Sequence, residues 1–169
     1  MASSSGMDLI HMYTDDTGHT RFARMCLPLC PPNCDRGSLG VFSQVLTKED
    51  VQFAMTPLPD DLRCSGEGPS LAHTAPRRQL VLTLRGYLEF KSVGVSTEDE
   101  EYKVIIGPGD VLLADDLTGC GHSWRFVPGP DGAVHPWVRA YVHLGEEYEA
   151  LRPRLRPASR PLGGGGGAA

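Results

Sequence analysis

Short apolar segments alternate with polar positions along most of the chain. The clearest example is the segment 77–86, RRQLVLTLRG, in which the row Leu80, Leu82 and Leu84 alternates with polar or mixed positions. A period of two places successive side chains on opposite faces of a β-strand. The segment therefore predicts a strand, and we expect its leucine row to face the core.

The same pattern, interrupted by Gly, Pro, Asp and Asn, predicts further strands. They lie at 7–16, 21–29, 39–46, 51–57, 87–93, 102–109, 110–114, 122–127 and 136–144. We expect Gly86 to turn the chain into a hairpin between 77–86 and 87–93, and the last two strands to pair across the turn 128–135. The segment 57–70 has the composition of a loop that lines a site.

The chain length and its turn residues favour one all-β domain. The 169 residues are enough for a single hydrophobic core, and the 20 Gly and 14 Pro favour many short strands over long helices. We predict a flexible N-terminus at 1–6, a β-domain at 7–152 that ends in a short helical segment, and a disordered Pro/Gly-rich tail at 153–169.

Charge and hydropathy narrow the range of partners. The net charge of −5 supplies no basic face for phosphates, so we expect no nucleic-acid partner. No apolar run approaches the roughly 20 residues that cross a bilayer, and we expect no membrane partner. The start of the chain lacks a secretory pattern, and the five cysteines are odd in number, which favours a reducing compartment. We expect a cytoplasmic protein.

The stretches 73–86 and 109–122 resemble the two sequence motifs of the cupin superfamily. The first family motif has two His and a Glu ahead of a strand that ends in Gly, and here six residues separate Gln79 from Gly86, as in the family between Glu and Gly. The second motif keeps its first Gly and its final His, although it is two residues longer and has Leu117 where Pro is usual.

The resemblance covers about residues 7–145, and it is to small single-domain cupins that mostly have no assigned reaction. It implies a double-stranded β-helix, which is a jelly-roll barrel, commonly with one divalent metal in its lumen.

In the family register His73, Gln79 and His122 occupy the metal-ligand positions, and Ala75 replaces the second His. All three candidate ligands are neutral, and an amide is a poor ligand for iron, manganese, zinc or nickel. The resemblance therefore implies a weak or absent metal site, unless Asp115 or Asp116 takes part.

Polar residues near the expected barrel mouth are candidates for substrate binding. Arg77 has the strand parity of Gln79, and its guanidinium would bind a carboxylate or an enolate, or else form a surface ion pair. Arg139, Tyr141 and His143 share one face of their strand, which is either the lumen wall or the solvent side.

Together these features predict a cupin-like barrel that binds a small, anionic organic molecule. If it is an enzyme, His122 and His73 are the candidates for general acid and base catalysis by an isomerase or lyase. The alternatives are a non-catalytic ligand-binding or dimer-building cupin and a metal-dependent dioxygenase. A homodimer is a further expectation from the resemblance.

Overall fold

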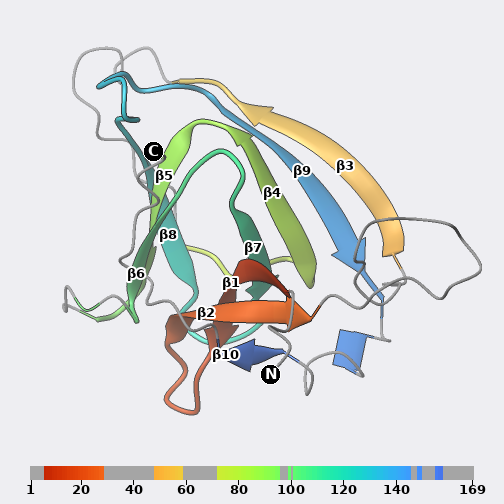
Figure 1. The fold of residues 1–169 in the computed structure, drawn as a ribbon. Coiled ribbons are helices and arrows are strands. Elements are labelled where there is room, and N and C mark those ends of the chain that lie inside the picture. Colours follow the sequence, from red (N-terminus) through yellow and green to blue (C-terminus); the bar gives the residue numbers. More distant parts are fainter. Residues whose placement is uncertain are drawn as a thin grey trace, which may run out of the picture.

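A computed structural model describes residues 6–28, 48–58, 72–95, 99, 101–145, 148–149 and 155–157. The regular structure in these ranges is β (Figure 1). The strands are β1 (Gly6–Thr14), β2 (Thr20–Pro28), β3 (Lys48–Thr56), β4 (Gln79–Arg85), β5 (Tyr87–Ser92), β6 (Lys103–Ile106), β7 (Val111–Asp115), β8 (His122–Val127), β9 (Trp137–Leu144) and β10 (Arg156–Pro157). The prediction of an all-β fold is confirmed.

The strands form two separate sheets and not one closed barrel. The larger sheet has the order β10-β2-β1-β7-β4-β9-β3, and the smaller has the order β6-β5-β8. All pairs are antiparallel except β1 with β7. In Figure 1 the neighbours β3, β9 and β4 curve along one side of the molecule, and β5, β6 and β8 lie along the other.

Both predicted strand pairs at chain reversals are wrong. β4 and β5 follow each other through Gly86 but belong to different sheets, and so do β8 and β9. Gly86 has a φ of 89°, and a Cβ there would lie 2.7 Å from the carbonyl oxygen of Pro136. A single glycine in this conformation makes a corner between the sheets, whereas a tight hairpin uses a turn of at least two residues.

The predicted core face of β4 is also wrong. Val81 and Thr83 are buried between the sheets, whereas Leu82 is half-buried and Leu84 is 50% exposed. Only Leu80 of the leucine row packs in an apolar cluster, and that cluster lies apart from the main core. Gln79 and Val81 of the other row face inward and line a cavity between the sheets, whereas Arg85 at the end of that row is exposed.

Two apolar clusters stabilise the fold. The main core lies between the sheets and is formed by Ile10, Met12, Phe22, Ala75, Val81, Leu88, Phe90, Val104, Ile106, Leu112, Ala114, Phe126 and Trp137. A second cluster is formed by Leu9, Leu27, Leu113, Leu144 and Tyr148, with partly buried neighbours that include Leu155. The second cluster ties the end of the domain to the outer side of the larger sheet.

The domain extends beyond the predicted boundary at residue 152. β10 pairs with β2 through Arg156 and Pro157, so this part of the predicted disordered tail is a strand. Of the predicted helical segment, Tyr148 and Glu149 form a short turn in which the Tyr148 N–H donates to the Gly145 carbonyl. The predicted strand 39–46 and the tail from 158 onward lie outside the described residues, as do residues 1–5 and most of the predicted loop 57–70.

No helix in the described ranges is long and apolar enough to cross a membrane.

Candidate functional site

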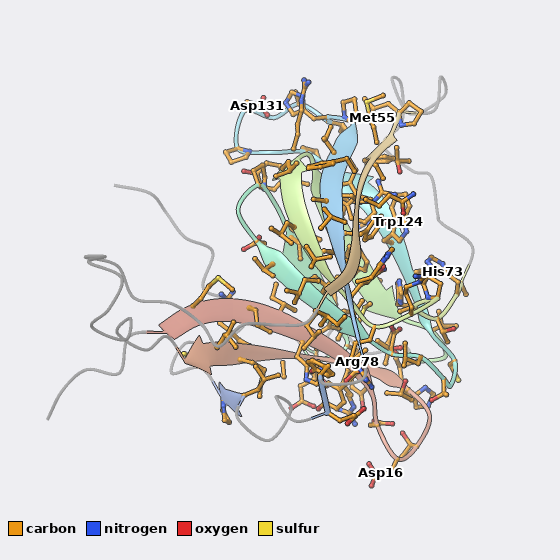
Figure 2. The ribbon with its side chains drawn as sticks, turned by 90° about the vertical axis from the view of Figure 1, so that its right-hand side faces the viewer. Asp16, Met55, His73, Arg78, Trp124 and Asp131 are labelled. Carbon is orange, nitrogen blue, oxygen red and sulfur yellow. The ribbon has the colours of Figure 1, made fainter. Side chains whose placement is uncertain are left out.

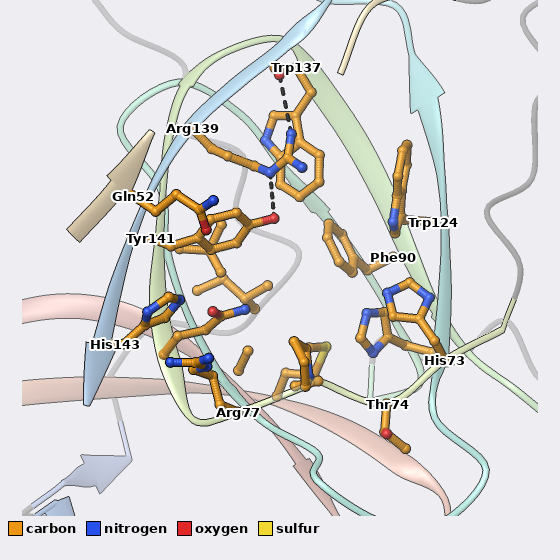
Figure 3. Close-up of a pocket in the computed structure, with 18 residues that line it drawn as sticks. Gln52, His73, Thr74, Arg77, Phe90, Trp124, Trp137, Arg139, Tyr141 and His143 are labelled. Carbon is orange, nitrogen blue, oxygen red and sulfur yellow. Dashed lines mark hydrogen bonds between the residues drawn. The ribbon is translucent and has the colours of Figure 1, made fainter. Parts of the chain in front are cut away.

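A cavity of about 790 Å³ lies between the two sheets. Strands of both sheets and the segment before β4 contribute its walls (Figure 3). All of the residues predicted from the sequence for a site line it: His73, Arg77, Gln79, His122, Arg139, Tyr141 and His143. The structure therefore brings the candidate residues together, although they lie in several separate segments.

One wall of the cavity comes from β9. Its period of two directs Trp137, Arg139, Tyr141 and His143 to the same side, so this face is the cavity wall and not the solvent side. Arg139 is half-buried, and its Nε–H donates to the Tyr141 hydroxyl at 2.5 Å. Its Nη1–H donates to the Thr56 hydroxyl at 2.8 Å and to the Trp137 carbonyl at 3.4 Å. These bonds hold the guanidinium in one place.

The charge of Arg139 is not neutralised by a carboxylate in the described part of the chain, since its hydrogen bonds go to hydroxyl and carbonyl groups. Its guanidinium carbon lies 3.9 Å from the centroid of a Trp137 ring and 5.1 Å from that of Tyr141. Among the described residues that line the cavity, none is Asp or Glu, whereas two are Arg. The charge of Arg139 in this wall therefore favours an anion.

On the opposite wall two histidines lie side by side. His73 and His122 exchange both backbone hydrogen bonds, at 2.9 and 3.0 Å, in an isolated bridge that ties the segment before β4 to β8. The bridge places the centroids of their rings 4.6 Å apart. Both rings line the cavity, and His122 is buried.

A buried carboxylate orients His122. Oδ2 of Asp116, a fully buried residue, lies 2.7 Å from His122 Nδ1. The same oxygen accepts a hydrogen bond from Thr20 Oγ1 at 3.0 Å, and Oδ1 accepts one from the Ala75 N–H at 3.3 Å. Because a carboxylate accepts hydrogen bonds, Nδ1 carries the proton of the neutral imidazole and the lone pair lies on Nε2. This arrangement is suited to general acid and base catalysis at Nε2.

The cavity does not provide the ligand set that the cupin resemblance implies for a metal. Asp116, which could have supplied a missing carboxylate, is engaged by His122 Nδ1 and by Thr20. In the described ranges no group of three or more His, Cys, Asp or Glu side chains is placed to hold a metal ion. His73, Gln79 and His122 would offer two imidazoles and one amide, without the carboxylate that offsets metal charge.

Arg78 and Asp115 lie next in sequence to site residues, but their side chains point away from the cavity. They form a separate ionic network. Arg78 Nε donates to Asp115 Oδ1 at 2.6 Å, and His11 Nε2 lies 3.2 Å from Asp115 Oδ2. Figure 2 shows Arg78 close to β1 and β2 and away from Trp124, which lines the cavity. The predicted parity of Arg77 with Gln79 is therefore confirmed: Arg77 lines the cavity and Arg78 does not.

The network keeps Asp115 ionised. Burial by itself raises the pKa of this carboxyl, but the hydrogen bonds from His11 and Arg78 and the charge of Arg78 outweigh burial. The pKa of Asp115 consequently lies below its usual value.

Sequence reasoning missed three contributions to the site. It considered Asp116 only as a metal ligand, and it gave no role to Trp124 or Trp137. The alternation of β9, which places Trp137 and Arg139 on one face, was the available signal for Trp137. Nothing in the local sequence pairs Asp116 with His122. Comparison with known proteins found no matching family model and no matching curated protein.

Proposed function

We propose that the cavity binds a small organic anion whose carboxylate pairs with Arg139. The observation that carries this proposal is a guanidinium that is fixed by three hydrogen bonds, has no carboxylate partner in the described residues and lies in a cavity wall. These three bonds use Nε and Nη1, so the N–H groups of Nη2 are left to donate to a carboxylate oxygen. The aromatic side chains of the wall would exclude water and strengthen the ion pair.

We further propose that the protein is an isomerase or a lyase that uses His122 as its base. Nε2 would take a proton from a carbon next to the ligand carbonyl, and the electron pair of the broken C–H bond would move onto the carbonyl oxygen as an enolate. In an isomerisation the proton returns to a neighbouring carbon, from His122 or from the adjacent His73. In a lyase step the same electron pair expels a leaving group.

Intrinsic fluorescence gives a direct test of binding, because both Trp residues of the chain, Trp124 and Trp137, line the cavity. Titration with carboxylates should change the emission and saturate. Arg139→Gln should weaken carboxylate binding by about 10- to 100-fold. The matched control is Arg85→Gln, which removes the same charge from an exposed residue outside the cavity. Equal affinity in the two variants would refute the role of Arg139.

Proton exchange separates an enzyme from a binding module. A bound carboxylate with a second carbonyl at its far end, toward His122, should exchange the hydrogen next to that carbonyl for deuterium in D₂O, as followed by NMR. His122→Ala should abolish the exchange and leave binding in place. Saturable binding without exchange in the natural protein would favour the alternative, a non-catalytic ligand-binding cupin.

The jelly-roll fold of the cupins is also a proposal. It is supported by the two-sheet arrangement and by the two motif-like stretches, whose positions His73, Gln79 and His122 line one cavity. We propose at most weak divalent binding at these three residues. The dioxygenase alternative requires a firmly held iron, and the fit of the residues argues against it.

A homodimer remains a proposal, and β3 offers a surface for it. Among the described strands β3 is the last of the larger sheet, and its apolar row consists of Val51, Phe53 and Met55, with Phe53 74% exposed. An exposed apolar row on an edge strand is a site of association. Sedimentation velocity of the natural protein and of Phe53→Ser tests the proposal: a monomer in both would contradict it.

The cytoplasm is the proposed compartment, because the odd number of cysteines favours a reducing environment.

A further inference from the structure

We infer that the ligand is an aryl carboxylate, or a carboxylate with a comparably flat conjugated body, and not a short carboxylic acid. This inference rests on the proposed function, because it assumes that Arg139 takes the carboxylate. It adds a second donor for that carboxylate, a surface for the body of the ligand and a minimum length.

A continuous row of aromatic rings separates the two chemical ends of the cavity. Arg139 lies over a Trp137 ring at 3.9 Å, and the Trp137 and Phe90 ring centroids are 5.9 Å apart. The Phe90 centroid is in turn 5.5 Å from that of His122. The row therefore runs from a guanidinium through an indole and a phenyl ring to an imidazole. In Figure 3 Arg139 and Trp137 lie at one end of the cavity, His73 lies toward the other, and Phe90 lies between them.

The middle of the cavity is apolar. Trp124 stands against Trp137 with the ring centroids 5.3 Å apart, and Val81 and Leu112 also line the cavity. Aromatic side chains prefer offset or edge-to-face contact with another ring, and they offer large apolar surfaces to a flat ligand. Gln52, Tyr141 and His143 line the β9 side of the cavity (Figure 3), and the aromatic and aliphatic side chains offer a surface for a flat apolar body with an anionic end at Arg139.

Trp137 supplies an unused hydrogen-bond donor next to Arg139. The residue is 4% exposed, and its Nε1–H has no acceptor among the described residues. A buried donor without an acceptor is unfavourable, because it has lost water and gained no partner. A carboxylate on Arg139 would lie beside the indole, and its second oxygen would accept this hydrogen bond. The two donors explain why the site would select a carboxylate over a neutral group of similar size.

A small acid is too short to contact both ends of this row of rings at once. A carboxylate such as propionate would fill one end, leave the surface of Phe90 uncovered and place no carbon at His122. A ring of the ligand between the two ends covers that surface. The cavity of about 790 Å³ is large enough for it.

Isothermal titration calorimetry with three matched probes tests the inference: 3-phenylpropionate, propionate and 3-phenylpropanamide. We expect 3-phenylpropionate to bind at least 10-fold more tightly than propionate, which lacks the ring, and at least 10-fold more tightly than the amide, which lacks the charge. Trp137→Phe keeps a ring and removes the N–H, and it should weaken 3-phenylpropionate several-fold. Tyr87→Phe, which removes a donor from an aromatic ring outside the cavity, is the control, and its affinity should stay within about 2-fold.

The outcomes separate this inference from the proposed function. Equal affinity for propionate and 3-phenylpropionate would overturn the inference and leave anion binding intact. Equal affinity for the acid and the amide would overturn anion binding at Arg139, and the inference with it. No binding of any probe would overturn both. Because the probe comparison uses the natural protein, it decides the matter even where Trp137→Phe fails to fold.

Discussion

Two adjacent aspartates, Asp115 and Asp116, meet two different histidines on opposite sides of the larger sheet. Asp115 lies 3.2 Å from His11 and accepts a hydrogen bond from Arg78 at 2.6 Å. Asp116 lies 2.7 Å from His122 and accepts its other side-chain hydrogen bonds from a hydroxyl and a backbone N–H. Both carboxylates are buried. They differ in whether a cation neutralises them.

This difference separates a structural site from a functional one. Asp115 is compensated by Arg78, which also bonds Glu149 and lies over the ring of Tyr148, so the network ties β7 to β1 and to the end of the domain. Asp116 has no arginine partner in the described ranges, and its negative charge acts on one imidazole in a cavity wall. A carboxylate that orients a histidine in this way sets its tautomer.

The largest expected effect comes from removing the compensated carboxylate. Asp115→Asn leaves the partly buried Arg78 without its main partner, and breaking such a pair destabilises a protein by about 3 kcal/mol. Urea unfolding followed by circular dichroism measures the loss. The affinity of the cavity for carboxylates should change little, since Arg78 lies outside it. A loss below about 1 kcal/mol would show that the network does not stabilise the fold.

Low pH should weaken the ionic network of Asp115, Arg78 and His11. The folded pKa of Asp115 lies below its usual value, whereas the unfolded chain takes up the proton near the usual value of about 4. The stabilisation is therefore complete above that range and is lost as the pH falls through the folded pKa.

Unfolding free energies between pH 7 and pH 3 should fall less steeply in Asp115→Asn than in the natural protein. Some dependence should remain, because the pKa of Glu89 is lowered as well: burial raises it, but the hydrogen bond and charge of Arg125 outweigh burial. Identical curves for the two proteins would exclude Asp115 as a source of acid sensitivity.

A smaller loss of stability, about 2 kcal/mol, is expected for Asp116→Asn, because the hydrogen bonds to a charged acceptor become bonds to a neutral one. The more informative change is in the tautomer of His122. In the natural protein its Nδ1 should carry the proton, and in the variant the preference for this tautomer should weaken. Nitrogen-15 NMR of the histidine rings measures the populations. Deuterium exchange into a bound carboxylate should fall by about 100-fold, with carboxylate affinity within a few-fold.

Much of the strand content could be predicted from the sequence, because a period of two is a local signal. It correctly placed Arg139, Tyr141 and His143 on one face, and it assigned Arg77 to the side of Gln79. The period of two could not predict strand pairing where the paired strands are far apart in the sequence. A strand that follows Gly86 can pair with its predecessor or cross to another sheet, and the local pattern is the same in both cases.

The errors on β4 and at Asp116 have different causes. The rule that apolar rows face inward assumes a dry core, but the interior of this domain contains a cavity whose wall includes Gln79. The cupin register identified His73 and His122 as neighbours in space, yet it read the nearby carboxylates as possible metal ligands. The hydrogen bond from His122 to Asp116 depends on how β7 leaves the sheet, which no local pattern encodes.

The smallest effect on stability, about 1 kcal/mol, is expected from adding a third carboxylate, through Gln79→Glu. Asp115 and Asp116 are both engaged by histidines, so neither is available to a metal, and His73, Gln79 and His122 offer only two imidazoles and an amide. Purified natural protein should therefore carry well below one equivalent of divalent metal and release it to a chelator. The new carboxylate, in the cavity that His73 and His122 also line, should raise the occupancy, because its charge offsets that of the ion. His122→Ala should abolish metal binding both in the natural protein and in Gln79→Glu.

Elemental analysis of the proteins, prepared in one medium, measures the bound metal. A full equivalent in the natural protein would mean that Asp116 can leave His122 to join the site. The contrast between the two aspartates would then fail.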